Sequence, residues 1–205
     1  MTEYKTIAVG ELGVNCYLVF SPETGNGYIL DPGDESGKII GAVNEHNIRP
    51  GAVILTHAHI DHAGGISPLL SEYDIPLLMH RDDLPVLDSP MNREMAGMLG
   101  LEMPPQPDGF FAEGEKVAGD GIGLEVIHTP GHTPGSVCLR AGNLLFTGDT
   151  LFAGSIGRTD LPGGDFKTLQ SSLDKLRTLP PEMTVLPGHG EPSDLKREVE
   201  FNPFM

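Results

Sequence analysis

The chain has 205 residues, of which 39% are hydrophobic and 20% charged, and its net charge is −16. This composition is typical of a globular protein, and no apolar run approaches the roughly 18 to 20 residues that span a bilayer. The negative charge would repel a polyphosphate backbone, and the N-terminus lacks the pattern of a signal peptide. We therefore expect a single domain, residues 1–205, that is cytoplasmic and binds neither nucleic acid nor membrane.

Alternating strand and helix patterns run through the chain. Short apolar runs bounded by Gly, Pro or Asp predict strands at 15–20, 27–30, 52–56, 124–128, 136–140 and 144–147. Apolar residues at helical spacing predict helices at 36–46, 91–99, 166–176 and, more briefly, near the C-terminus. Because an antiparallel beginning is followed by interspersed helices and strands, we expect an α/β fold with two sheets between helical layers.

Five sulfur-containing side chains are expected in the interior. Met91, Met95 and Met98 follow i, i+4 and i+7 spacing, which is more often core packing than a flap over a substrate. A flap is the alternative. Cys16 and Cys138 lie in apolar strand-like stretches, which favours buried reduced thiols over a disulfide.

Four residues of metal-ligand type lie directly after the apolar run at 52–56. They are His57, His59, Asp61 and His62. Residues two apart in an extended segment point the same way, so His57 and His59 can bind one ion. The turn that follows can direct Asp61 and His62 towards a second ion. A polar solvated turn is the alternative, but it does not explain this density of histidines.

Three further candidate ligands each follow a predicted strand end beside a glycine, which lets the backbone turn tightly. Two ions with three ligands each and one shared carboxylate would use all seven candidates. A coordination position then stays open for a water that becomes a nucleophile near neutral pH, with Asp61 orienting it. The first ion would be held by His57, His59 and His132, the second by Asp61, His62 and His189, with Asp149 between them.

The segment from His57 to His62 has the form HxHxDH, and with the three later ligands it resembles the metallo-β-lactamase superfamily over nearly the whole chain. The resemblance implies an αββα sandwich of two mixed sheets flanked by helices, with a dinuclear site at one edge. Residues 129–136, 148–165 and 202–204 resemble the glyoxalase II-like branch, the hydroxyacylglutathione hydrolases. That branch hydrolyses thioesters such as S-lactoylglutathione, which implies a small-molecule thioester substrate and two divalent metal ions, with zinc first and iron or manganese as alternatives.

Arg158 is the candidate substrate-binding residue. It lies where larger glyoxalase II enzymes have a basic residue that contacts glutathione, but the tyrosine they have two positions later is Asp160 here. Two roles stand side by side: a bidentate contact to a substrate carboxylate, or an ion pair with Asp160 or Asp165. Sixteen residues follow His189, so the resemblance is to a short form without the C-terminal glutathione-binding domain.

Three histidines fall outside this ligand scheme. His128 directly precedes the turn that carries His132, so we expect it to be buried or to support that turn. His46 and His80 are expected at the surface.

Several other functions share this ligand set. A mononuclear iron persulfide dioxygenase of the same fold would need only His57, His132 and Asp149. A lactone or ester hydrolase would face the same carbonyl chemistry as a thioesterase. A β-lactamase is less favoured, because a bridging Asp149 belongs to the hydrolase-type set, and the net charge disfavours RNA processing. A non-enzymatic module would instead have closed four-coordinate sites.

Overall fold

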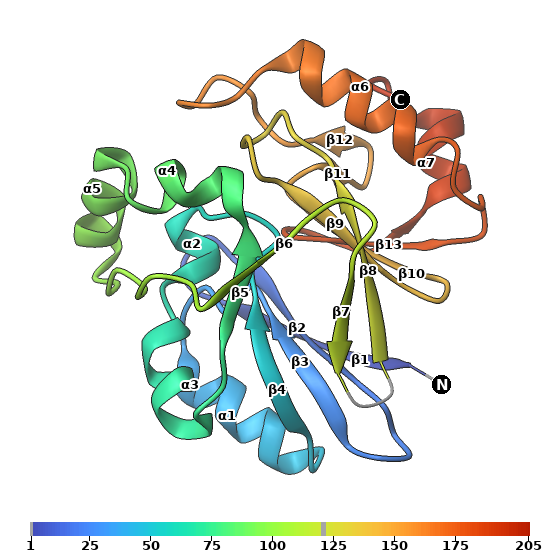
Figure 1. Ribbon diagram of the computed structural model, residues 1–205. Coiled ribbons are helices and arrows are strands. Elements are labelled where there is room, and N and C mark those ends of the chain that lie inside the picture. The colour runs from blue at the N-terminus through green and yellow to red at the C-terminus, as the bar shows by residue number, and fades with distance from the viewer. Residues whose placement is uncertain (1, 120–121) are drawn as a thin grey trace.

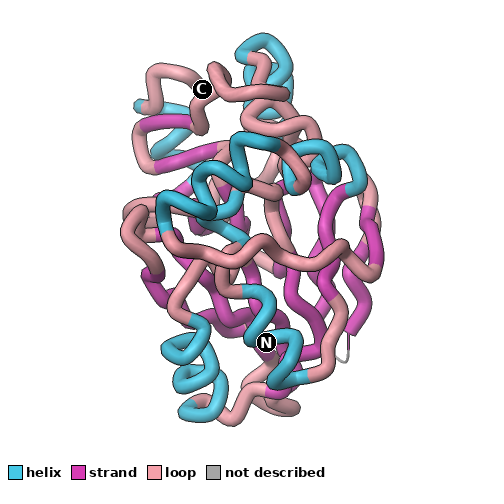
Figure 2. The backbone as a smooth tube through the Cα atoms, turned by 90° about the vertical axis from the view of Figure 1, so that its left-hand side faces the viewer, coloured by secondary structure: helices cyan, strands magenta, loops and turns pink. Residues whose placement is uncertain are grey.

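The computed structural model describes residues 2–119 and 122–205. Two six-stranded sheets lie face to face, and helices cover their outer faces (Figure 1). Figure 2, turned by 90°, shows helices and loops in front of the strands. The expected αββα sandwich of two mixed sheets is confirmed.

The first sheet has the order β1-β2-β3-β4-β5-β6. Its first three strands are antiparallel, and β3 to β6 are parallel. Helices α1 (Ser36–Glu45) and α3 (Ile66–Tyr73) connect its parallel strands. The strand bounds are Glu3–Val9, Val14–Phe20, Asn26–Leu30, Arg49–Ile54, Leu77–His80 and Gly109–Phe111.

The second sheet has the order β14-β13-β10-β9-β8-β7. Strands β10 and β13 are parallel, and the other neighbours are antiparallel. Its helices are α6 (Phe166–Leu176) and α7 (Leu195–Phe201), and a small hairpin pairs β11 (Leu151–Phe152) with β12 (Ser155–Ile156). From β7 to β10 and then β13 and β14, the strand bounds are Lys116–Gly119, Ile122–His128, Val137–Ala141, Leu144–Gly148, Thr184–Pro187 and Ser193–Asp194.

Four short elements complete the edge of the sandwich. They are α2 (Ile60–Ala63), the 3₁₀ helix η1 (Arg81–Asp83), α4 (Leu84–Leu87) and α5 (Pro90–Leu99). In Figure 1, α4 and α5 lie beside α2, away from both large sheet faces.

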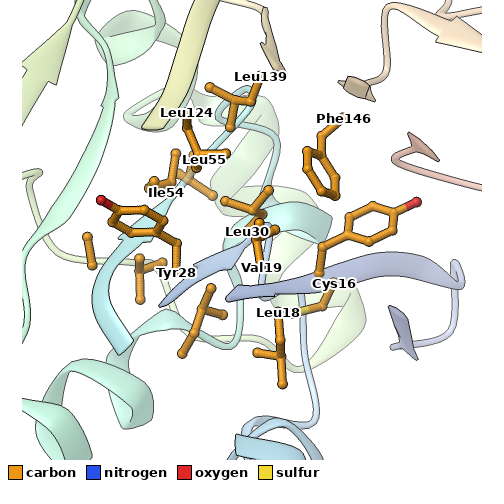
Figure 3. Close-up of a cluster of buried hydrophobic side chains, with 14 of the residues drawn as sticks. Cys16, Leu18, Val19, Tyr28, Leu30, Ile54, Leu55, Leu124, Leu139 and Phe146 are labelled. Atoms are coloured by element: carbon orange, nitrogen blue, oxygen red, sulfur yellow. The ribbon is translucent and has the colours of Figure 1, made fainter. Parts of the chain in front are cut away.

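The main core lies between the two sheets (Figure 3). Every residue of β2 is buried, because the second sheet covers one face of this strand and other chain segments cover its opposite face. Phe146 from β10 packs edge-on against Tyr17 from β2, with ring centroids 5.1 Å apart. A second cluster lies beneath α6, whose Leu169, Leu173 and Leu176 recur at the spacing that predicted this helix.

Two expectations about the interior have different outcomes. Cys16 and Cys138 are both buried and free. The core-packing expectation for the methionines is wrong, because Met91 and Met95 are only half-buried and Met98 is 76% exposed. Helix α5 lies at the edge of the sandwich, so its methionine stripe does not face the space between the sheets.

No helix in the described part of the chain has both the length and the apolar character needed to cross a membrane.

Candidate metal centre

The candidate ligands lie together at one edge of the sandwich. Strands β4, β8, β10 and β13 each lead into a loop or short helix there, so both sheets contribute side chains. The structure brings all seven residues together. They are His57, His59, Asp61, His62, His132, Asp149 and His189.

The HxHxDH segment spans the end of the β4 loop and helix α2. His59 precedes the first turn of this helix and keeps an extended backbone, with φ −68° and ψ 143°. Asp61 and His62 lie within the helix. The turn expected from the sequence is therefore helical. Strand β4 ends at Ile54, and two residues later the N–H of Thr56 donates to the Asp31 carboxylate rather than to a neighbouring strand.

His57, His59 and His132 form the first group. Nε2 of His132 lies 3.0 Å from Nδ1 of His59. The ring centroid of His57 lies 4.9 Å from that of His59 and 4.8 Å from that of His132. All three side chains are buried. Three imidazole nitrogens are thus close enough to bind one ion.

Asp61, His62 and His189 form the second group. Nε2 of His62 lies 3.2 Å from Nε2 of His189. Oδ2 of Asp61 lies 3.4 Å from the same His189 nitrogen. This group combines two imidazoles with one carboxylate, a mixed donor set that suits zinc or iron.

Asp149 lies between the two groups. Its Oδ2 is 3.7 Å from Nε2 of His132 and 3.6 Å from Nε2 of His189. Its Oδ1 is 3.4 Å from Nε2 of His62. One carboxylate therefore faces histidines of both groups.

Hydrogen bonds on the outer side fix the orientation of His132 and His189. Nδ1 of His132 donates to the backbone carbonyl of Arg158 over 2.7 Å, and Nδ1 of His189 donates to that of Leu12 over 3.1 Å. A carbonyl can only accept, so each Nδ1 carries a proton, and in the neutral ring the lone pair is on Nε2. Both Nε2 atoms face inward, as metal-binding histidines require.

Asp31 gives similar support to His57 and His62. Its carboxylate accepts a hydrogen bond from Oγ1 of Thr56 over 2.6 Å, and this hydroxyl lies 3.2 Å from Nδ1 of His57. Nδ1 of His62 lies 3.1 Å from Oδ2 of Asp31. Sequence reasoning missed Asp31. Its only signal was an Asp-Pro-Gly after a predicted strand, which usually marks a turn.

The inward-facing nitrogens fit a cation. The Nε2 atoms of His62 and His189 face each other over 3.2 Å, and the buried Nε2 atoms of His57 and His59 have no hydrogen-bond partner among the described residues. Unpaired buried acceptors are costly, and a divalent ion would satisfy them. Gly188 leaves the space open, because a Cβ there would lie 2.3 Å from Oδ1 of Asp149.

The electrostatics keep the Asp149 carboxylate charged and the imidazoles of His57 and His59 neutral. His62 differs, because burial lowers its pKa but Asp149 and Asp61 outweigh burial and raise it above its ordinary value. Burial raises the pKa of Asp149, but His62, His132 and His189 outweigh it and hold this pKa below its ordinary value. Burial, with His132 nearby, lowers the pKa of His59 to about 4. Burial lowers the pKa of His57 as well. Anionic oxygens and neutral nitrogens are the protonation states in which these side chains bind metals.

A second buried carboxylate, Asp83 from η1, links the loops that carry the first group. Its Oδ2 accepts hydrogen bonds of 2.8 Å from the backbone N–H of Ala58 and from Oγ1 of Thr133, and its Oδ1 accepts from the N–H of Gly135. Ala58 separates His57 from His59, and Thr133 follows His132. Sequence reasoning missed Asp83, because nothing in its local pattern distinguishes it from the exposed Asp82 beside it.

His80 and His128 stack outside this site, with ring centroids 4.1 Å apart and an interplanar angle of 14°. The surface expectation for His80 is wrong, since it is only 9% exposed. Nε2 of His128 donates to the carbonyl of Pro134, so His128 supports the His132 turn as expected. Asp82 also lies near this pair, but stacked rings direct their lone pairs side by side rather than to one point.

An open cleft of about 360 Å³ borders both groups of ligands. Arg158 lies at this cleft and makes a bidentate ion pair with Asp160, with two N···O distances of 2.8 Å. Asp165 instead caps α6 by accepting from the N–H of Thr168. Of the two roles expected for Arg158, the structure shows the ion pair with Asp160.

Family comparison agrees with this geometry. Residues 9–189 match the family described as the metallo-beta-lactamase superfamily. The chain belongs to the metallo-β-lactamase superfamily. Membership in this superfamily of metallo-hydrolases supports a metal-dependent hydrolase, and the clustered histidines and aspartates are of the kind that binds a divalent metal.

Three known proteins are similar to this chain along nearly their whole length. Hydroxyacylglutathione hydrolase GloC from Haemophilus influenzae is 34% identical, covering 98% of this chain and 97% of the relative, which agrees with a short glyoxalase II-like form. The structure of BLEG-1 B3 metallo-beta-lactamase is 32% identical with a TM-score of 0.91, covering 98% and 99%. TTHA1623 in a di-iron-bound form is 40% identical with a TM-score of 0.89, covering 98% and 100%.

Proposed function

We propose that this chain is a dinuclear metal-dependent hydrolase that cleaves a thioester, as glyoxalase II does. The observation that carries this proposal is the position of Asp149 between two groups of histidines beside an open cleft. A structural metal site would be closed by four protein ligands, whereas a catalytic site keeps a position open. The name of the relative GloC supports the choice of a hydroxyacyl thioester.

In this proposal the first ion is held by His57, His59 and His132, and the second by Asp61, His62 and His189, with Asp149 shared. Zinc is the first candidate because it suits imidazole and carboxylate donors, and manganese is an alternative. Iron is an equally direct candidate, since a relative with 40% identity has been seen in a di-iron-bound form.

The candidate ligands and Asp61 have different roles in the proposed hydrolysis. Bound ions would supply an activated water and would polarise the thioester carbonyl. Asp61 accepts a hydrogen bond from the attacking water and so orients it. Burial raises the pKa of Asp61, but His62 and His189 hold it below its ordinary value, so the carboxylate remains an acceptor.

The bond changes need no separate general acid. The oxygen of water joins the carbonyl carbon, the carbon–sulfur bond breaks, the sulfur leaves as a thiolate, and the two protons of the water pass to solvent as the carboxylate forms. A thiol with a pKa of about 8.5 leaves readily as its anion. His132 and His189 keep their positions throughout, held by their hydrogen bonds to the carbonyls of Arg158 and Leu12.

Metal content measured on the purified protein, followed by paired assays, tests the proposal. We expect about two metal equivalents per chain and hydrolysis of S-lactoylglutathione or a simpler thioester. One iron per chain with oxygen uptake on glutathione persulfide would instead indicate a dioxygenase that uses His57, His132 and Asp149.

β-Lactam hydrolysis is the second candidate, because the similar structure BLEG-1 is named a B3 metallo-beta-lactamase. The same assays should therefore include a chromogenic β-lactam and a simple lactone. If the β-lactam is turned over faster than every thioester, β-lactam hydrolysis would replace thioester hydrolysis as the first candidate.

A further inference from the structure

Apart from the candidate ligands, the cleft offers a substrate mainly apolar surface. Five of its lining side chains are apolar, and they come from the β1–β2 turn, α5, β11 and the segment before α6. We call these five residues the apolar wall. They are Leu12, Met91, Met95, Phe152 and Leu161.

Arg158 is the one Lys or Arg among the described residues that line the cleft, and it is already paired. Both Nε and one terminal nitrogen of Arg158 lie 2.8 Å from oxygens of Asp160. A substrate carboxylate would bind the same two N–H donors of the guanidinium, and Asp160 already occupies them. The hydrogen bond from Arg158 lowers the pKa of Asp160 to about 2, so Asp160 is an anion at neutral pH.

From this arrangement we infer that the site takes a thioester with an uncharged, apolar arm, and that Asp160 disfavours thioesters with a terminal carboxylate. The inference rests on the proposed thioester hydrolysis. An apolar arm gains free energy by covering the apolar wall. A carboxylate arm must displace Asp160 from Arg158 and must also approach a chain with a net charge of −16.

The strength of the ion pair sets the size of the effect. The side chains of Arg158 and Asp160 are 62% and 69% exposed, so solvent weakens their attraction. Exposed pairs favour the paired state by up to about fivefold. Asp160 therefore reduces the affinity for a carboxylate by a factor of this order and does not exclude it.

The test uses two thioethers that lack a thioester bond and differ at one end, which is charged in one and neutral in the other: an S-alkyl 3-mercaptopropionate and its methyl ester. Calorimetry on the metal-loaded protein gives the dissociation constant of each. We expect the wild type to bind the methyl ester more tightly, and Asp160→Asn to improve carboxylate binding relative to the ester by about two- to fivefold. Asp174→Asn is the matched control, since Asp174 pairs with Arg177 over 2.8 Å without lining the cleft.

The same preference for the neutral compound should appear in the turnover of two thioesters, an S-acyl 3-mercaptopropionate and its methyl ester. Equal binding of the two thioethers by the wild type, or an unchanged binding ratio in Asp160→Asn, would overturn the inference. If the ester is preferred but neither thioester is cleaved, the proposed hydrolysis fails while the assigned ligand class stands. If both are cleaved without preference, the hydrolysis stands and the inference fails.

A second variant tests the apolar wall. Met95→Gln keeps the length of the side chain but makes its end polar, and we expect KM for the methyl ester thioester to rise by about threefold. Met98→Gln is the control on the same helix, because Met98 is 76% exposed and does not line the cleft. Equal effects of the two substitutions would show that Met95 does not contact the substrate.

Discussion

The ligand end of the cleft is buried and held by hydrogen bonds, whereas the wall that faces the substrate is apolar and partly exposed. Asp31 and Asp83 each accept hydrogen bonds from segments that carry ligands. Met91 and Met95 are only half-buried and come from a helix at the edge of the sandwich. Fixed geometry suits metal ligands, whose positions must be precise, while flexible side chains suit a surface that adapts to its ligand.

The largest effect is expected from removing a candidate ligand at the buried end of the cleft. We expect His59→Ala to reduce thioester hydrolysis by roughly 10³-fold or more, because the first group loses one of its three nitrogens. Metal content and the hydrolysis rate should be measured together. Wild-type hydrolysis in this variant would contradict the dinuclear assignment, whereas loss of hydrolysis with residual oxygen uptake on a persulfide would favour the dioxygenase.

Asp83→Asn tests whether the buried hydrogen bonds matter for metal binding. An amide has one acceptor oxygen, so its NH₂ group would face an N–H donor of either Gly135 or Ala58. We expect metal affinity to fall by about 10- to 100-fold, as measured by competition with a chelator. Asp88→Asn is the control, since Asp88 is exposed and pairs with Arg93. Equal affinities in the two variants would show that Asp83 supports the fold alone.

The substrate side can be weakened through the first turn of α5. Oγ of Ser89 accepts a hydrogen bond from the N–H of Asn92 over 3.1 Å and caps this helix. We expect Ser89→Ala to lower the free energy of unfolding by about 1 kcal/mol. Urea denaturation measures this change. Metal affinity should fall far less than in Asp83→Asn. An equal fall would mean that the stability of α5 and the binding of metal are coupled.

The slowest chemical reaction is expected at the two cysteines, whose thiols are buried in the core. Burial raises the pKa of Cys138 to about 11 and raises that of Cys16 well above its ordinary value. The reactive thiolate is therefore scarce at pH 8, and the folded protein should react slowly with a thiol reagent. Both thiols should react at once in denaturant. Rapid labelling of the folded protein would show that the core opens more readily than its packing suggests.

Local patterns predicted α1, α5, α6 and α7 and the seven-residue strands β2 and β8, but missed the seven-residue strand β1 and the eight-residue helix α3. The apolar spacing of Phe166–Leu176 gave the bounds of α6 without error, and that of Pro90–Leu99 placed α5 within one residue. Short edge strands such as β6 and β14 were not predicted, because two or three residues carry no measurable period. The orientation of the methionine stripe was also missed, since spacing indicates which residues share a face but not what covers that face.

The candidate metal ligands could be predicted from the sequence, but the residues that hold the ligand-bearing segments in place could not. Histidines in the HxHxDH spacing are rare enough to be noticed, and their strand-end positions implied that they would meet. Asp31 and Asp83 act through bonds to backbone atoms remote in sequence, and such long-range contacts leave no local pattern. The pairing of Arg158 with Asp160 was one of two stated alternatives, and geometry was needed to choose between them.

The hydrogen bonds of α7 suggest how such a protein can change its substrate. Asn202 donates to the carbonyl of Ser155, and Glu198 accepts from the N–H of Gly154, so this helix holds the hairpin that carries Phe152 to the cleft. Substitutions in α7 can thus reshape the apolar wall without altering any ligand. Specificity can therefore evolve along one segment of the chain while the inherited chemistry at the other end of the cleft is kept.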